Sequence, residues 1–380
     1  MSQRIVFITG SIDPTIGGVE RVTWSLSMFF ESINYECFYI YYGEDSPIIS
    51  SNKKLHLEYF NCTNEIEFYN TFRAFIIENG ISIIINQDYY TSPLLYSLRE
   101  IKKEFNIKLF FCYHRNPLFE DVMNGYNSRR IILKNTIKRL INKKVYYPGF
   151  VQLKDICDRY VVLSKSYINL FSKRFDIEKK RIISINNPIP FDSTYELDID
   201  SKEKTVLIVT RFVEKIKNIK ASIRIWKQIE EWGYDGWNLV IAGYGKDEEE
   251  IKNYANILGL KSCSFIGKLE DPTSYYKKSA VLMMTSNCEG YPMTIIEAMQ
   301  FGCVPIAFNN YSSLKDIINN NINGIIVPSK KEGCFSKKLF KLMNNNSFRI
   351  SLALNAVESS KFNSIENIGQ CWIKLFDTLP

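Results

Sequence analysis

Short apolar runs alternate with amphipathic stretches along the first half of the chain. The runs are rich in β-branched and aromatic residues, and the stretches between them repeat apolar residues at helical spacing. Strands are predicted at Ile5–Ile8, Cys37–Tyr42, Leu55–Tyr59, Ile81–Ile85 and Lys108–Cys112, and helices at Val19–Ser32, Glu65–Asn79 and Leu94–Phe105. Strands that are apolar throughout and alternate with helices indicate a parallel sheet covered on both faces.

The second half of the chain repeats this alternation and predicts a second parallel sheet. Its strands are expected at Lys204–Thr210, Trp237–Ala242, Ser264–Ile266, Ala280–Met284, Val304–Phe308 and Gly324–Val327. Two short strands, Ile156–Leu163 and Ile182–Ile185, complete the first half. The predicted fold class is therefore α/β, with two Rossmann-like doubly wound domains that face each other across a cleft.

The boundary between the domains is marked by composition. Two prolines, Pro188 and Pro190, precede the polar stretch Asp192–Lys204, which is typical of an inter-domain linker. We therefore assign residues 1–190 to the first domain and 191–358 to the second. The last segment repeats apolar residues at helical spacing from Ile368 to Phe376. We expect residues 359–380 to form a helix that crosses back to the first domain.

The stretch from Glu289 to Met299 carries the densest candidate chemistry. Gly290 and Pro292 mark a tight turn after a buried strand, and helix-forming residues follow to Gln300. The free N–H groups of Met293, Thr294 and Ile295 would make an anion site at the strand's carboxyl end. Carboxylates on either side of a bound phosphate would accept hydrogen bonds from hydroxyls, as a nucleotide sugar requires. The candidate binding residues are Glu289, Gly290, Tyr291, Pro292, Met293, Thr294 and Glu297. Ordinary solvated carboxylates are the alternative.

Basic residues follow another predicted strand at the same edge. Arg211 comes directly after it, and Lys215 and Lys217 follow shortly. A guanidinium suits bidentate contact with phosphate, and an ammonium adds a point charge. Together with the helix N–H groups, these cations could neutralise a leaving diphosphate. A solvated basic turn is the alternative.

Two candidate binding features of the first half also follow predicted strands. Gly17-Gly18 follows the first strand and opens a helix, so the backbone there can approach a ligand closely. The loop lacks the Gly-x-Gly-x-x-Gly pattern of nicotinamide-binding proteins. His114 follows a later strand, where ligands of α/β sheets bind. A turn glycine pair and a histidine that satisfies the core are the alternatives.

Composition narrows the class of protein. The 380 residues are 46% hydrophobic and 23% charged, as in soluble globular proteins. Nine scattered cysteines and two histidines fit neither a zinc site nor a disulfide framework, and no Asp-x-Asp cluster ends a strand. We expect no cofactor, a metal-independent reaction and a cytoplasmic location. The net charge of +7 allows an anionic partner, but the basic residues are too local for a nucleic-acid groove.

The sequence resembles the retaining family 4 glycosyltransferases, which have the GT-B fold. The resemblance covers nearly the whole chain, and its most specific parts are the Glu-x7-Glu stretch and the Arg–Lys pair. Its landmarks, in order, are Gly17-Gly18-Val19-Glu20-Arg21, His114, Ser164, Asn187-Pro188, Arg211 with a following lysine, and Glu289 seven residues before Glu297-Ala298-Met299.

The resemblance implies a nucleoside-diphosphate sugar as donor, usually UDP-linked, held mainly by the C-terminal domain. Glu297 would bind the ribose and Glu289 a sugar hydroxyl, while Arg211 and Lys217 would hold the diphosphate. From the first domain, Gly17 and Gly18 would approach the phosphate, and His114 would contact the sugar near the reacting carbon. Retention in this family is thought to occur by front-face attack, without a protein nucleophile.

Two positions depart from the family pattern. The family's glycine before the arginine is Thr210 here, and the spacing from Arg211 to Lys217 is one residue longer. Lys215 therefore stays open as the partner of Arg211.

The leading hypothesis is transfer of a sugar to a glycan or lipid-linked acceptor, in surface polysaccharide or lipopolysaccharide synthesis. A sugar-nucleotide epimerase would need acid–base groups on both sides of the sugar, and the chain has only two histidines. A non-catalytic nucleotide-sugar-binding module would close around its ligand without releasing UDP.

Residues 129–144 form a basic amphipathic segment. Apolar residues from Leu133 to Ile141 share one helical face, and lysines and arginines crowd the other. This pattern is typical of a helix on an anionic membrane surface, at the inner face of the cell membrane. A helix that packs its apolar face on the core and exposes its basic face is the alternative.

If the membrane interpretation holds, changing Lys134, Lys138 and Arg139 to glutamate will abolish sedimentation with anionic liposomes, because the charge attraction is reversed. Vesicles of neutral lipid serve as the control. Binding to anionic vesicles that survives the triple change contradicts the interpretation.

Overall fold

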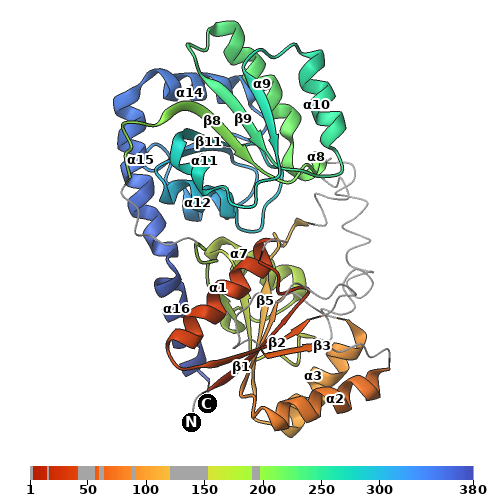
Figure 1. Ribbon diagram of the computed structural model, residues 1–380. Coiled ribbons are helices and arrows are strands. Elements are labelled where there is room, and N and C mark those ends of the chain that lie inside the picture. The colour runs from red at the N-terminus through yellow and green to blue at the C-terminus, as the bar shows by residue number, and fades with distance from the viewer. Residues whose placement is uncertain are drawn as a thin grey trace. The chain divides into compact units, whose positions relative to one another are not determined.

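The computed structural model describes residues 3–14, 17–41, 56–59, 64–87, 91–119, 153–190 and 197–379. These residues form two compact units, each built around one parallel sheet (Figure 1). The described parts of the first unit run to Pro117, from 153 to Pro190, and from Ile365 onward, and those of the second include 197–364. The basic segment 129–144 lies outside the described residues.

The first unit contains a seven-stranded sheet in the order β3-β2-β1-β4-β5-β6-β7, with every neighbouring pair parallel. Its strands are β1 (Arg4–Thr9), β2 (Glu36–Tyr41), β3 (His56–Tyr59), β4 (Ile83–Gln87), β5 (Lys108–Tyr113), β6 (Arg159–Val162) and β7 (Ile182–Ser184). Its helices are α1 (Gly18–Ser32), α2 (Glu65–Glu78), α3 (Ser92–Glu104), α7 (Lys165–Phe175) and α16 (Ile365–Asp377), with a 3-10 turn at Lys179–Arg181.

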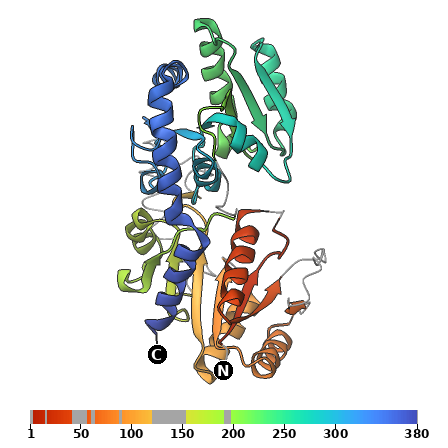
Figure 2. The same cartoon turned by 60° about the vertical axis from the view of Figure 1, so that its left-hand side comes forward.

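Helices cover both faces of this sheet, as the apolar strands predicted. Side chains of α2, α3 and α7 pack on one face, and those of α1 and α16 on the other. Figure 2 shows α16, the blue helix that leads to the C-terminus, running alongside the first unit. It buries Ile368, Trp372 and Phe376 against the sheet. A Cβ built on Gly369 would lie 2.2 Å from the ring of Phe29, so a glycine lets α16 approach α1 closely.

The second unit contains a six-stranded sheet in the order β10-β9-β8-β11-β12-β13, again with parallel pairs. Its strands are β8 (Glu203–Val209), β9 (Asn238–Ala242), β10 (Cys263–Gly267), β11 (Ser279–Met284), β12 (Val304–Phe308) and β13 (Ile325–Val327). Its helices are α8 (Glu214–Lys217), α9 (Ile219–Trp232), α10 (Glu248–Ile257), α11 (Thr273–Lys278), α12 (Met293–Gln300), α13 (Leu314–Ile317), α14 (Glu332–Asn344) and α15 (Asn346–Ser360), with a 3-10 turn at Lys361–Asn363.

Most predicted strands coincide with observed ones within two residues at each end. One is clearly shorter than predicted: the apolar run Ile156–Leu163 yields only Arg159–Val162. The reason is a turn at its start, where the amide of Ile156 donates to the carbonyl of Leu153. No helix in the described part of the chain is both long and apolar enough to span a lipid bilayer.

Two glycines in the loop after β9 allow its backbone to pack closely against the backbone of the loop after β8. Gly243 has a φ of +147°, and a Cβ there would lie 1.7 Å from the carbonyl oxygen of Thr210. Gly245 has a φ of +156°, and a Cβ there would lie 2.5 Å from the carbonyl oxygen of Phe212. The amide of Phe212 donates to the Tyr244 carbonyl over 2.7 Å. These close backbone contacts fix the segment that carries Arg211.

We expect Gly243→Ala to cost at least about 4 kcal/mol of unfolding free energy, because a Cβ at that position overlaps backbone atoms that cannot move aside. Gly259→Ala is the matched control: its φ is also positive, at +62°, but no described atom lies within 4 Å of the added Cβ. That change should cost only about 1–2 kcal/mol, the strain of a left-handed residue. Urea unfolding followed by tryptophan fluorescence measures both. Equal costs for the two variants would disprove the close contact.

Candidate functional site

The strand order of the second unit creates a topological switch point between β8 and β11. The chain leaves β8 toward β9 on one side, and β11 continues toward β12 on the other. Ligands of open α/β sheets bind at the carboxyl ends of the two strands at such a point. Arg211 follows β8 and Glu289 follows β11. The sheet topology therefore brings these two predicted site segments to one place.

Hydrogen bonds tie the loop after β8 to the loop after β11. The backbone amide of Asn287 donates to the Ile216 carbonyl over 2.7 Å, and its side-chain amide donates to the Lys215 carbonyl over 3.1 Å. In return, the side chain of Asn218 donates to the carbonyl of Thr285 over 3.3 Å, and the Thr285 hydroxyl donates to the Asn218 carbonyl over 2.9 Å. Asn218 has a φ of +51°, the left-handed conformation that asparagine tolerates. The short helix α8 is thus fixed over the loop that carries Glu289.

With α8 held over this loop, Lys217 forms an ion pair with Glu289. The lysine Nζ lies 2.7 Å from Oε1 of the carboxylate, and the two side chains are only 19% and 13% exposed. Lys215 and Arg211 are exposed. Of the two candidate lysines, Lys217 is therefore the one that the fold places against the predicted sugar-binding carboxylate.

Helix α12 begins at Met293, as predicted, and among the described residues no side chain caps its N-terminus. The prediction that the amide of Ile295 is free is wrong, because that amide donates to the Pro292 carbonyl over 3.0 Å. The first turn is tightened in this way, which leaves the amides of Met293 and Thr294 to point outward from the helix end. These two residues are half-buried beside Gly290, which is also half-buried.

Tyr291 and Pro292 are buried rather than open to a ligand. The side-chain amide of Asn363 donates to the Tyr291 hydroxyl over 2.9 Å within the core. Tyr291 therefore anchors the 3-10 turn after α15 to the loop before α12.

The second predicted carboxylate, Glu297, is 3% exposed. Its Oε2 accepts a hydrogen bond from the hydroxyl of Tyr276, 2.8 Å away, and the Tyr276 ring stacks on Phe301. A buried carboxylate needs such a partner, since an unpaired one would be costly. Tyr276 was not predicted as a site residue, because nothing in the spacing of α11 relates it to α12.

In the first unit, Gly17 and Gly18 form the start of α1, and no side chain of the described residues caps it. No described atom lies within 4 Å of a Cβ built on Gly18. A Cβ on Gly17 would meet only Glu20 Oε2, at 2.6 Å, the end of a flexible side chain. The sheet order places this turn beside the carboxyl end of β4, because β1 and β4 are neighbours.

His114 follows β5, and its Nε2 lies 2.6 Å from Oε1 of Gln87 at the end of β4. Burial, and to a lesser extent the positive charge of Arg115, lowers the pKa of His114 to about 4. The imidazole is therefore neutral at neutral pH. Gln87 was not predicted as a site residue, although it is a polar residue at the carboxyl end of an apolar strand.

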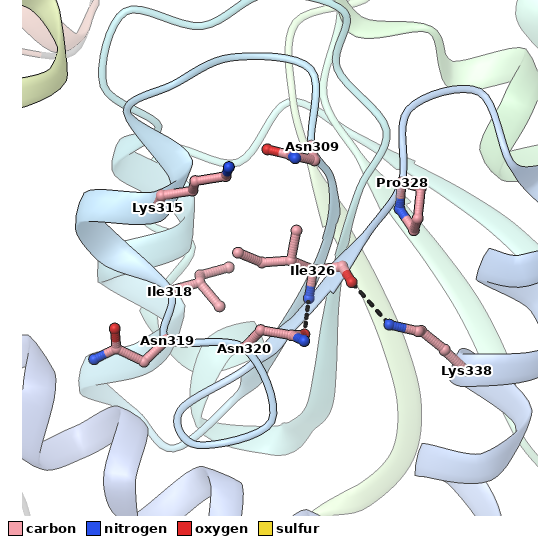
Figure 3. Close-up of a pocket in the computed structure, with 8 residues that line it drawn as sticks. All are labelled: Asn309, Lys315, Ile318, Asn319, Asn320, Ile326, Pro328 and Lys338. Atoms are coloured by element: carbon pink, nitrogen blue, oxygen red, sulfur yellow. Dashed lines mark hydrogen bonds between the residues drawn. The ribbon is translucent and has the colours of Figure 1, made fainter.

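Within the described residues, no group of three or more histidine, cysteine, aspartate or glutamate side chains is arranged to hold a metal ion. A separate hollow of about 520 Å³ lies beside β12 and β13 and contains none of the predicted site residues. Figure 3 shows Lys315 and Asn309 pointing toward each other across it. On its other side, Lys338 Nζ donates to the Ile326 carbonyl over 2.9 Å.

Comparisons with known proteins give the site a context. The model of the family "Glycosyl transferases group 1" matches residues 193–359. An N-acetylgalactosaminyltransferase of Campylobacter jejuni that acts on an undecaprenol-diphosphate glycan is 32% identical over 259 residues, 66% of each chain. The amylovoran biosynthesis glycosyltransferase AmsD of Erwinia amylovora is 25% identical over 372 residues, covering 94% of this chain and 95% of AmsD.

Solved structures agree on the fold. Anabaena Alr3699/HepE in complex with UDP superposes with a TM-score of 0.78 at 14% identity, over 99% of this chain and 100% of that one. Residues 193–359 therefore belong to the glycosyl transferases group 1 family, and the chain has the GT-B fold of two doubly wound parallel sheets.

Proposed function

We propose that the protein transfers a sugar, with retention of configuration, from a UDP-sugar to a glycan or lipid-linked acceptor in surface polysaccharide synthesis. The observation that carries this is the ion pair at the β8/β11 switch point between Lys217, at the end of α8, and Glu289, in the loop before the N-terminus of α12. A cation, a carboxylate and helix amides in one place are the groups that a sugar diphosphate requires. The Anabaena structures that bind UDP and UDP-glucose support this donor class. The names of the Campylobacter and Erwinia relatives support the acceptor class.

In this proposal the charged groups have separate roles. Arg211, Lys217 and the amides of Met293 and Thr294 bind the diphosphate and stabilise the negative charge that develops on it as the glycosidic bond breaks. Glu289 accepts a hydrogen bond from a hydroxyl of the donor sugar, and Glu297 binds the ribose. Gly17, Gly18 and His114 contact the donor from the first unit, as in the family that the sequence resembles.

The chemistry needs no protein nucleophile. The acceptor oxygen attacks the anomeric carbon from the face that the diphosphate leaves, and the departing phosphate oxygen takes the acceptor's proton. A bond forms between the acceptor oxygen and the anomeric carbon, and the bond between that carbon and the phosphate oxygen breaks. The protein supplies orientation and charge, which are large contributions to catalysis. We also propose peripheral contact with an anionic membrane through residues 129–144.

The test is a panel of UDP-sugars ranked by thermal shift, followed by UDP release and the product's anomeric configuration with the best binder. Lys217→Ala should lower kcat/KM for the donor by about 10- to 100-fold, because a hydrogen bond to a charged group is worth about 1.5–3 kcal/mol. Lys215→Ala is the matched control, since Lys217 is the lysine of the two that forms the ion pair with Glu289. It should change kcat/KM by less than about 3-fold.

The outcomes separate the alternatives. Full activity in both Lys217→Ala and Arg211→Ala would overturn the diphosphate role. Stabilisation by a UDP-sugar without any UDP release, with glycan and lipid-linked acceptors supplied, would identify a non-catalytic binding module. An anomer inverted relative to the donor would rule out retention.

The proposal also predicts that UDP release continues at an unchanged rate in excess EDTA, because protein cations and helix amides neutralise the diphosphate. The measurement compares initial rates before and after dialysis against the chelator. Loss of activity in EDTA that Mg²⁺ or Mn²⁺ restores would show that a metal does this work instead.

A further inference from the structure

Gln87 is buried at the carboxyl end of β4 and faces His114. Gln87 is only 1% exposed, and its side-chain Oε1 lies 2.6 Å from Nε2 of the His114 imidazole. Strand register explains the contact: Gln87 is paired with Cys112 on β5, and His114 comes two residues later. The contact is therefore part of the sheet edge rather than a chance meeting of two flexible side chains.

Each partner in this contact keeps a second polar atom that is buried and unmatched. Within the described residues, neither Nε2 of Gln87 nor Nδ1 of His114 has a hydrogen-bond partner. Leaving a buried polar atom unpaired is unfavourable, because the atom loses its hydrogen bond to water and gains none in the protein. Such atoms are therefore expected to meet a group that binds there, and they lie at the strand ends where α/β sheets bind ligands.

The orientation of the Gln87 amide determines which His114 nitrogen carries the proton and which can accept a hydrogen bond. With the amide oxygen placed toward the ring, the oxygen can only accept, so the neutral imidazole carries its proton on Nε2. Nδ1 then holds a lone pair, and the Gln87 amide holds N–H donors. Nδ1 can therefore accept a hydrogen bond from a hydroxyl group that lies on the side of the ring away from Gln87.

We propose that Gln87 is a positioning residue that holds His114 in the Nε2–H tautomer, so that Nδ1 accepts a hydrogen bond from a hydroxyl of the ligand. This deepens the proposed function, because it rests on His114 contacting the donor sugar. Gln87 itself acts through the histidine, because its amide lies against Nε2 and not beside Nδ1.

The first test does not depend on activity. The chain contains two histidines, His56 and His114, so long-range ¹H–¹⁵N spectra of the imidazoles show two ring systems, which His56→Asn assigns. In the wild type, we expect His114 Nε2 to resonate as a protonated nitrogen and Nδ1 as a bare one. In Gln87→Met, which removes the acceptor at similar size, the two tautomers should exchange. A wild-type spectrum with the proton on Nδ1, or a Gln87→Met spectrum like wild type, overturns the proposal.

The second test is kinetic. Gln87→Met should lower kcat with the best donor by about 3- to 10-fold, the loss of one neutral hydrogen bond. Gln87→Glu places a carboxylate against Nε2–H, which raises the pKa of His114 and favours a proton on both ring nitrogens, so Nδ1 should lose its lone pair and kcat should not recover. Ser97→Ala removes a fully buried hydroxyl from the same unit and so controls for packing. It should leave both the His114 tautomer and kcat unchanged.

The two proposals fail in different ways. If no UDP-sugar is turned over, the proposed function fails, while the tautomer shift between wild type and Gln87→Met still shows whether Gln87 positions the ring. If turnover is normal in Gln87→Met, the positioning role fails and the glycosyl transfer stands.

Discussion

The hydrogen bonds between the loops after β8 and β11 determine the electrostatics of the second unit. Without the amide of Asn287 on the Ile216 carbonyl, nothing in the strand geometry requires α8 to lie over Glu289. With it, Lys217 and Glu289 share a half-buried ion pair at 2.7 Å. Removing such a pair from water costs desolvation energy that offsets much of the attraction between the two charges. The value of the pair here is positional, since it holds a cation and a carboxylate ready at the end of α12.

This arrangement also explains why the departures from the family pattern are tolerated. Thr210 stands where the resemblance expects glycine, yet it is not among the residues with positive φ. The close backbone contact that needs a missing Cβ is supplied instead by Gly243, on the neighbouring strand exit. The longer spacing from Arg211 to Lys217 is taken up by α8, a single helical turn ending in the left-handed Asn218. The backbone arrangement around Arg211 and Lys217 is therefore stabilised by residues that the family pattern does not include.

Features that depend on residues close together in the sequence were predicted, and those that depend on residues far apart were not. Strands and helices depend on local periodicity, so β12 and α12 were predicted to the residue. Helix α15 was missed because it is only weakly amphipathic, and α14 was missed although its buried residues Phe335, Leu339 and Leu342 recur at helical spacing. Single contacts were beyond reach: Tyr276 meets Glu297 only through packing of α11 against α12, and Gln87 meets His114 only through strand register.

The two units use the same topology for different chemistry. Each has a switch point between its first strand and the strand that reverses the order, β1/β4 in one and β8/β11 in the other. The described strand ends around the first carry an uncharged buried pair, since burial keeps His114 neutral beside the Gln87 amide, and the exposed Arg115 follows it. Those of the second carry Arg211, Lys217 and Glu289. Neutral donors and acceptors select hydroxyl groups, while fixed charges select a phosphate. Within each unit, the kind of group that can bind is therefore set by the side chains at the strand ends and not by the topology that the two sheets share.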